Sequence, residues 1–167
     1  MAAKAKPSAA HKVIDLLTQA GKTIVTAESC TGGLIAAALT DIPGASAAVH
    51  GGFVTYSNTA KSRMIQVPPR LIRDYGAVSN QVARAMADGA RNTARTDYAI
   101  AATGIAGPDG GSEKKPVGLV YIAVSTDLAT VVIEHRLGDL GRETIRQATV
   151  AAALALILQV LTDDPEE

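Results

Sequence analysis

The strongest constraint on the fold is the alternation of short apolar segments with helical patterns. Segments 22–27, 49–56 and 97–103 read as strands, and patterns typical of helices lie between them. Strands joined through helices pair in parallel, because such connections cross over the sheet. Segment 97–103 is nearly all apolar, which predicts a strand buried on both faces. Segments 117–125 and 130–137 add a hairpin through Asp127, so the sequence predicts a mixed sheet of five strands between helical layers.

Capping residues mark where the helices begin and end. Ser8 precedes an amphipathic segment that stops at Gly21, and Ser79 precedes a second one that runs to about Ala94. Shorter helices are predicted at 34–39, after Ser57 or Asn58, and after Pro68-Pro69; a long one covers about 142–161. We expect a single domain over 1–167, with an ordered core at about 8–161 and flexible tails at 1–7 and 162–167.

Composition excludes several classes of protein. The 167 residues carry 16 Lys+Arg against 16 Asp+Glu, and aromatic residues make up only 3%. This argues against a nucleic-acid binder, which needs a basic surface or aromatic stacking platforms. The most apolar stretch, 148–161, is too short to span a membrane, and no secretory signal is apparent. Cys30 is alone, so neither an internal disulfide nor a metal cluster is predicted. We expect a soluble, cytoplasmic protein without a metal or cofactor.

Two loops follow predicted strands at their carboxyl ends, where open α/β sheets place their sites. The first, at 26–33, reads T-A-E-S-C-T-G-G and turns into a helix. A hydroxyl there, such as that of Ser29, can be exposed beside free helix-start amides suited to an oxyanion. The commoner interpretation is a helix cap, and the pattern alone favours it. The second loop, 103–112, is rich in glycine, and its backbone can approach a ligand closely, although it could also be only a long turn.

A base for Ser29 is not supplied by any obvious histidine. His11 falls in a predicted helix, and His50 and His135 fall in predicted strands. None of them has a second histidine at the H-x-x-x-H or H-E-x-x-H spacing typical of metal ligands. Lys61, just after the second predicted strand, is the notable candidate, since Ser–Lys pairs occur among variants of the catalytic triad. By spacing alone, a solvated helix lysine is the commoner interpretation.

Three separated motifs together resemble the CinA C-terminal domain family, whose enzymatic members are nicotinamide mononucleotide deamidases. They are T-A-E-S-C-T-G-G at 26–33, G-G-F-V-T-Y-S-N-T-A-K at 51–61, and T-G-I-A-G-P-D-G-G-S at 103–112 followed by K-P-V-G at 115–118. The G-A-V-S at 76–79 and the G-D-x-x-R…R pattern at 138–146 also fit. The similarity spans about residues 8–161.

The resemblance implies a three-layer α/β/α sandwich with a mixed, mostly parallel sheet of about five strands. It also implies hydrolysis of the carboxamide of nicotinamide mononucleotide to nicotinate mononucleotide and ammonia, with no metal or cofactor, in a homodimer. By motif position Ser29 would be the nucleophile, Lys61 its base and Tyr56 an assisting hydroxyl. The chain resembles the stand-alone form, without the molybdopterin-binding-like domain of many relatives.

Substrate and oxyanion contacts are expected from both loops and from the final helix. The oxyanion donors would be the backbone amides of Thr31, Gly32 and Gly33, and further substrate contacts would come from Thr103, Gly104, Gly107, Arg142 and Arg146. Either arginine could bind the phosphate or, as a nearby cation, lower the pKa of Lys61. The insertion of Leu140-Gly141 before Arg142 departs from the commoner G-D-R form of the family. It therefore stays open which of the two arginines has which role.

Three alternatives stay open at this point. Cys30 is a rival nucleophile, although the family pattern favours Ser29 and a buried apolar role for Cys30. The domain could instead be a catalytically silent binding or regulatory module related to competence or the DNA-damage response. It could also be an amidase for another small amide.

Overall fold

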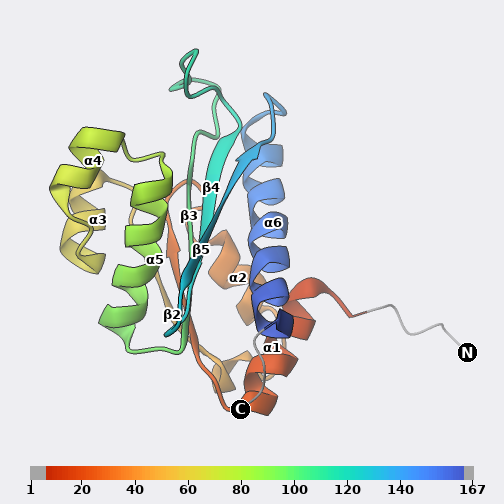
Figure 1. Cartoon of the computed structure of the whole chain (residues 1–167). Coiled ribbons are helices and arrows are strands. Elements are labelled where there is room, and N and C mark those ends of the chain that lie inside the picture. The colour runs from red at the N-terminus through yellow and green to blue at the C-terminus, as the bar shows by residue number, and fades with distance from the viewer. Residues whose placement is uncertain (1–6, 164–167) are drawn as a thin grey trace, which may run out of the picture.

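The computed structural model describes residues 7–163, which form a central sheet with helices on both faces (Figure 1). In chain order the elements are α1 (Ala9–Ala20), β1 (Ile24–Glu28), α2 (Leu34–Thr40), a 3-10 turn η1 (Ala45–Ala47), β2 (Val49–Val54), α3 (Asn58–Ile65), α4 (Pro69–Tyr75), α5 (Asn80–Ala94), β3 (Tyr98–Gly104), β4 (Leu119–Ser125), β5 (Thr130–Arg136) and α6 (Arg142–Asp163).

The five strands lie in the order β2-β1-β3-β4-β5. Strand β1 pairs in parallel with β2 and with β3, whereas β4 is antiparallel to both β3 and β5. Four strands therefore point one way and β4 points the other, which confirms a mixed sheet. Helices α1, α2 and α6 cover one face, and α3, α4 and α5 lie on the opposite side (Figure 1).

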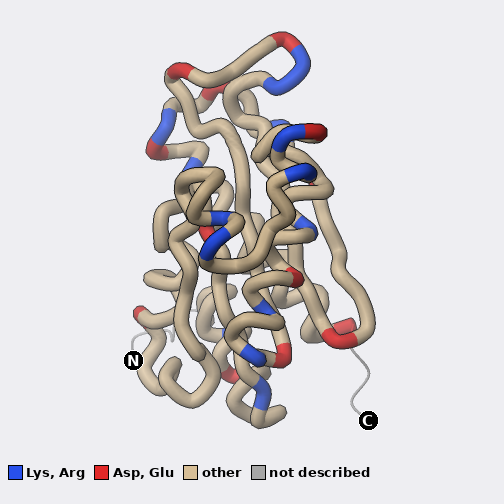
Figure 2. The backbone as a smooth tube through the Cα atoms, turned by 90° about the vertical axis from the view of Figure 1, so that its left-hand side faces the viewer, with Lys and Arg blue, Asp and Glu red and all other residues tan. Residues whose placement is uncertain are grey.

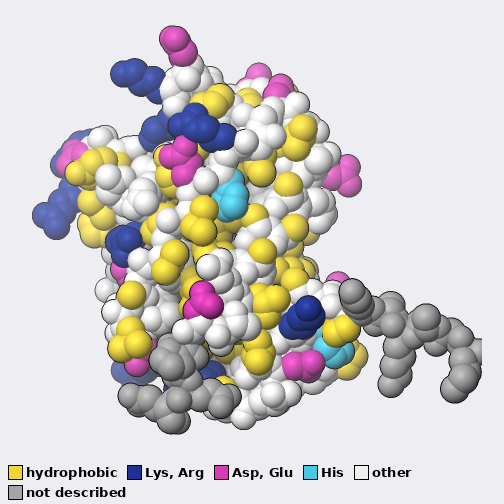
Figure 3. Space-filling model, turned by 45° about the vertical axis from the view of Figure 1, so that its right-hand side comes forward, with side chains coloured by type: hydrophobic (Ala, Val, Ile, Leu, Met, Phe, Trp, Pro, Cys, Tyr) yellow, Lys and Arg dark blue, Asp and Glu magenta, His cyan; other side chains and the backbone are white. Residues whose placement is uncertain are grey.

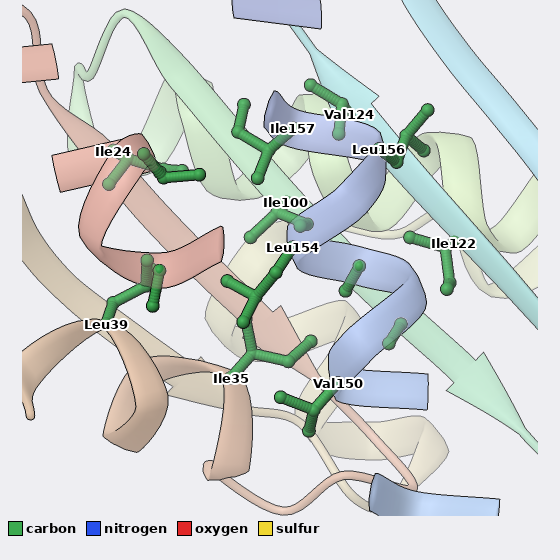
Figure 4. Close-up of a cluster of buried hydrophobic side chains, with 14 of the residues drawn as sticks. Ile24, Ile35, Leu39, Ile100, Ile122, Val124, Val150, Leu154, Leu156 and Ile157 are labelled. Carbon is green, nitrogen blue, oxygen red and sulfur yellow. The ribbon is translucent and has the colours of Figure 1, made fainter. Parts of the chain in front are cut away.

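Each face of the sheet has its own hydrophobic core. Between the sheet and α1, α2 and α6, side chains such as Ile35 of α2, Ile100 of β3 and Ile157 of α6 are fully buried (Figure 4). On the other face, small residues dominate, and Met86 of α5 packs over the alanines of β1, β3 and β4. Burial of these apolar surfaces is the main favourable contribution to folding. Strand β3 is buried on both faces over 98–103, as its composition predicted.

Local signals in the sequence placed the element boundaries well. Ser8 caps α1, Ser57 caps α3 and Ser79 caps α5, each accepting an amide hydrogen bond, and Gly21 ends α1 in a left-handed conformation. The final helix continues to Asp163, two residues past its predicted end. Most of the predicted tails, residues 1–6 and 164–167, lie outside the described residues.

Charged residues of both signs are spread along the described part of the chain. Figure 2 shows Lys and Arg positions interspersed with Asp and Glu positions along the described chain. Hydrophobic side chains are visible on the face in Figure 3, and an apolar groove of about 290 Å³ lies between β5 and α6, lined by residues including Val131, Ile133 and Leu156. Helix α6 is the one described helix long and apolar enough to cross a membrane by length and composition, and in the structure it packs against α1, α2 and the sheet.

Candidate active site

The register of the sheet brings three chain segments together at one edge. Glu28 at the end of β1 is aligned with Val54 of β2 on one side and Ala102 of β3 on the other. The Ser29 amide donates to the Ala102 carbonyl at 3.0 Å, and the Thr55 amide donates to the Glu28 carbonyl at 2.8 Å. Residues that follow these parallel strands therefore converge at the carboxyl edge, as open α/β sheets require.

The turn between β1 and α2 is built on two glycines and a buried carboxylate. Gly32 and Gly33 have φ values of +60° and +106°, which other residues rarely adopt. The Glu28 side chain is fully buried and turns back beneath the start of α2. Its carboxylate accepts from the amides of Gly33 at 3.0 Å, Ile35 at 3.0 Å and Ala36 at 2.8 Å. These are orphan donors of a helix start, so Glu28 fixes the turn that carries Ser29.

Lys61 reaches the Ser29 hydroxyl from the first turns of α3. Its Nζ lies 3.0 Å from Ser29 Oγ, 2.9 Å from the Thr55 carbonyl oxygen and 3.4 Å from that of Tyr56. Only 1% of the lysine is exposed, although it carries an ionisable amine. Long lysine side chains are almost never fully buried without a specific reason. Thus the structure brings together the predicted nucleophile and its predicted base.

Burial changes the proton affinities of two groups in this site. Desolvation lowers the pKa of Lys61 from its usual value, because a buried ammonium loses hydration. The same effect raises the pKa of Cys30 to about 11. Cys30 is 6% exposed and belongs to the core between the sheet and α1, α2 and α6. A thiol with that pKa stays protonated at neutral pH and is a poor nucleophile.

A pocket of about 270 Å³ opens over the Ser29–Lys61 pair. It is bounded by the β1–α2 turn, the β2–α3 connection, the segment before α5, the glycine-rich loop after β3 and the start of α6; its lining residues are Ser29, Cys30, Tyr56, Asn58, Lys61, Ala77, Val78, Thr103, Gly104, Ile105, Ala106, Gly107, Asp109, Gly110 and Arg142. Among residues 7–163, no three His, Cys, Asp or Glu side chains gather as a group that could hold a metal ion.

The two arginines at the start of α6 have different partners. Arg142 lines the pocket, where it donates to the Tyr56 hydroxyl at 2.9 Å and to the Gly107 carbonyl at 2.9 Å. Arg146, one helical turn later, donates to the carbonyls of Cys30 at 3.0 Å and Thr31 at 3.1 Å. Arg142 is therefore available to a ligand at the pocket, whereas Arg146 is bound to the backbone of the β1–α2 turn.

Comparison with known proteins gives a family match over most of the chain. The CinA C-terminal domain family matches residues 6–161. The chain belongs to this family. A CinA-like protein of Shewanella denitrificans is 46% identical over 162 residues, covering 97% of this chain and 38% of that protein. A putative competence-damage inducible protein of Acetivibrio thermocellus is 53% identical over 135 residues, covering 81% of this chain and 32% of that protein.

The chain spans about a third of the length of these curated relatives. Solved structures match over nearly their full length. A competence/damage inducible protein from Agrobacterium tumefaciens has a TM-score of 0.89 at 47% identity, covering 96% of this chain and 99% of that one. A competence damage-inducible protein A from Klebsiella pneumoniae has a TM-score of 0.90 at 33% identity, covering 94% and 97%. The α/β fold of the CinA C-terminal domain is thus shared.

Part of the predicted oxyanion site of this CinA C-terminal domain is wrong. The Gly32 amide donates to the Ser29 carbonyl at 3.1 Å, and the Gly33 amide donates to Glu28, so neither is free for a ligand. The turn is closed by its own backbone hydrogen bond, and the amides at the start of α2 donate to the Glu28 carboxylate. The sequence motif did not reveal either feature. Thr31 is fully buried, and among residues 7–163 its amide donates to no other group.

The remaining predicted residues lie at the site with differing partners. The Thr103 hydroxyl donates to the Ala77 carbonyl at 2.9 Å, while Gly104 and Gly107 line the pocket with backbone. Residue-level reasoning missed Glu28, Asn58 and Asp109 as parts of the site or its support. Each of the three lies in one of the motifs that carry the family resemblance. The motifs therefore contained these residues, but no role could be assigned to them individually from the sequence.

Proposed function

We propose that this CinA C-terminal domain hydrolyses the carboxamide of nicotinamide mononucleotide to nicotinate mononucleotide and ammonia. The observation that carries the proposal is the 3.0 Å contact between Ser29 Oγ and the Nζ of buried Lys61. A serine with a lysine base is a known solution for acyl transfer, and lysine acts as a base once its pKa is lowered.

The hydrogen-bond partners of Lys61 suit the neutral amine. In that form its two protons donate to the carbonyls of Thr55 and Tyr56, which lie at 2.9 and 3.4 Å. The nitrogen lone pair then faces the Ser29 hydroxyl, which becomes the donor across the same 3.0 Å contact. The two backbone carbonyls thereby direct the basic nitrogen at the proton it must remove.

Acylation begins when Ser29 Oγ attacks the carboxamide carbon and passes its proton to Lys61. The carbonyl oxygen of the substrate becomes an oxyanion that needs hydrogen-bond donors. Lys61 then gives the proton to the departing nitrogen, the C–N bond breaks and ammonia leaves. The product on the enzyme is a nicotinoyl ester of Ser29.

Deacylation repeats the same steps with water. Lys61 takes a proton from water, the hydroxide attacks the ester carbon and the bond to Ser29 Oγ breaks. The proton on Lys61 returns to Ser29 Oγ, and the carboxylic acid that forms loses its remaining proton to solvent and leaves as nicotinate mononucleotide. One base therefore serves both halves of the reaction.

Arg142 is our candidate for the phosphate ligand. Its guanidinium lies at the pocket with the hydroxyl of Tyr56, which is 59% exposed, and the backbone of the glycine-rich loop. Guanidinium groups bind phosphate with paired hydrogen bonds, and Arg142 can exchange its present partners for such an anion. The neutral net charge of the chain is compatible with this, because one well-placed cation suffices for a mononucleotide.

The deciding experiment measures ammonia release from nicotinamide mononucleotide, nicotinamide riboside and nicotinamide, with Ser29→Ala as the control. We expect release from the mononucleotide that Ser29→Ala abolishes, and far slower release from free nicotinamide. Release from a different amide alone would favour another amidase. An absence of release, with tight ligand binding retained, would favour the silent regulatory module suggested by the competence and damage names of the relatives.

The homodimer implied by the family resemblance stays a prediction. Light scattering on the purified chain measures its mass in solution and decides it directly.

A further inference from the structure

The amide groups just after the nucleophile are the remaining source of oxyanion donors. The amide of Ser29 donates to Ala102, that of Gly32 to the Ser29 carbonyl and that of Gly33 to Glu28. Among residues 7–163, the amides of Cys30 and Thr31 donate to no carbonyl and to no other residue's side chain. Cys30 lines the pocket beside Ser29, whereas Thr31 is fully buried, so the Cys30 amide is the donor that an oxyanion formed at Ser29 can reach.

The orientation of each unpaired amide is set by the carbonyl of the same peptide group. A trans peptide is planar, with its carbonyl and its N–H pointing in opposite directions. The peptide that carries the Cys30 amide is held at the Ser29 carbonyl by Gly32. The peptide that carries the Thr31 amide is held at the Cys30 carbonyl by Arg146 Nε at 3.0 Å. The peptide that follows the Cys30 amide is therefore fixed by a side chain from the far end of the sequence.

Arg146 is placed specifically for this role. It donates a second hydrogen bond to the Thr31 carbonyl at 3.1 Å, so its planar guanidinium bridges two successive carbonyls of one turn. A Cβ at Gly32 would come within 3.3 Å of the Arg146 Nη2 atom, in addition to the strain of a positive φ. The glycine thus leaves room for the arginine as well as for the turn.

We propose that Arg146 is a positioning residue that fixes the turn after Ser29, so that the Cys30 amide serves as an oxyanion donor for the Ser29 reaction, and that it does not bind the substrate phosphate. This inference rests on the proposed function only through Ser29 as nucleophile. It assigns Arg142 and Arg146 separate tasks, although they lie one turn apart on α6. Loss of Arg146 slows bond formation at Ser29 for any electrophile, with or without a phosphate.

The test uses diisopropyl fluorophosphate, followed by intact-protein mass spectrometry and peptide mapping. In that reaction Ser29 Oγ forms a bond to phosphorus, fluoride leaves and the hydroxyl proton passes to Lys61, while the phosphoryl oxygen needs the same donors. We expect Arg146→Gln to slow labelling of Ser29 about tenfold to hundredfold, in line with loss of an oxyanion donor. Arg146→Lys, which keeps a charge and one donor, should restore part of the rate.

The matched control is Arg84→Gln, because Arg84 also donates to a backbone carbonyl, that of Thr130, but from α5 to the start of β5. It should label at the wild-type rate. Thermal unfolding of each variant, with labelling measured well below the transition, separates misfolding from mispositioning. For nicotinamide mononucleotide, Arg146→Gln should lower kcat by the same factor and change KM less than about twofold.

A wild-type labelling rate in Arg146→Gln would overturn the inference. A raised KM with unchanged kcat would also overturn it, and would indicate that Arg146 binds the substrate. Labelling of wild-type Ser29 without turnover of the mononucleotide would refute the proposed substrate and leave the role of Arg146 standing. If wild-type Ser29 does not react at all, the nucleophile and the inference both fail.

Discussion

Replacing Glu28 removes three hydrogen bonds at once, and the cost can be worked from the structure. The carboxylate is fully buried and accepts from the amides of Gly33, Ile35 and Ala36. In Glu28→Ala these donors lose their acceptor, and an unpaired buried donor costs about 1–3 kcal/mol. The Ile35 amide bears the full cost because its bond is buried, while those of Gly33 and Ala36 are only partly buried and can reach water in part.

One full penalty and two reduced ones destabilise Glu28→Ala by about 4 kcal/mol. For a domain of this size, that lowers Tm by about 8–16 °C. Glu28→Gln keeps one oxygen for Gly33 and Ile35 but turns an NH₂ group toward the Ala36 amide. A donor then faces a donor, and the charge that favours the start of α2 is lost, so we expect about 2 kcal/mol.

Urea unfolding followed by circular dichroism measures both variants against the wild type. Asp74→Ala is the control, because within residues 7–163 Asp74 pairs only with exposed Arg73, and its loss should change the free energy of unfolding by less than about 0.5 kcal/mol. A Glu28→Ala protein within about 1 kcal/mol of the wild type would refute the reasoning. The turn would then hold its shape without the carboxylate.

Further outcomes follow from the same site. Lys61→Met should lose turnover while retaining ligand binding by calorimetry, and normal turnover would remove Lys61 as the base. Because the lysine must be neutral and burial lowers its pKa, kcat should rise with pH through a pKa below 10.5; a flat profile down to pH 6 would contradict this. Cys30→Ala should keep most of the activity, and iodoacetamide should alkylate Cys30 slowly at pH 8, because only thiolate reacts and the pKa is about 11. Arg142→Gln should raise KM for the mononucleotide at least tenfold and leave that for the riboside unchanged; equal effects on both would show that Arg142 does not read the phosphate.

The fold was largely predictable because its signals are local. Serine caps, terminal glycines and apolar periodicity lie within a few residues of the elements they define, and they located all five strands to within three residues. The convergence of the loops followed from parallel pairing. Local signals could not specify which strands are neighbours in the sheet. Two neighbouring pairs are parallel and two are antiparallel, although four of the five strands share a direction.

The site was predictable at the level of segments and less so at the level of atoms. Ser29 and Lys61 were placed by family resemblance, since spacing alone favoured a helix cap and a solvated lysine. Lys61 is buried where its amine meets Ser29 after β1 and the Thr55 carbonyl after β2, and no local pattern specifies that Ser29 lies there. The amides of Gly32 and Gly33 were misassigned for a similar reason. Their acceptors are a neighbouring carbonyl and a carboxylate that folds back from β1.

The two arginines show where sequence reasoning reaches its limit. A spacing of four residues on a helix places both on one side, so any pattern that brings Arg142 to the pocket brings Arg146 close as well. Their difference arises because the β1–α2 turn presents two carbonyls to the later residue, while the glycine-rich loop and Tyr56 meet the earlier one. These contacts join residues that are 35 to 116 positions apart, and hydrogen bonding over such separations leaves no periodic trace in a sequence. A single sequence can therefore identify the helix that serves a site, whereas the task of each side chain on it is decided by the backbone it meets.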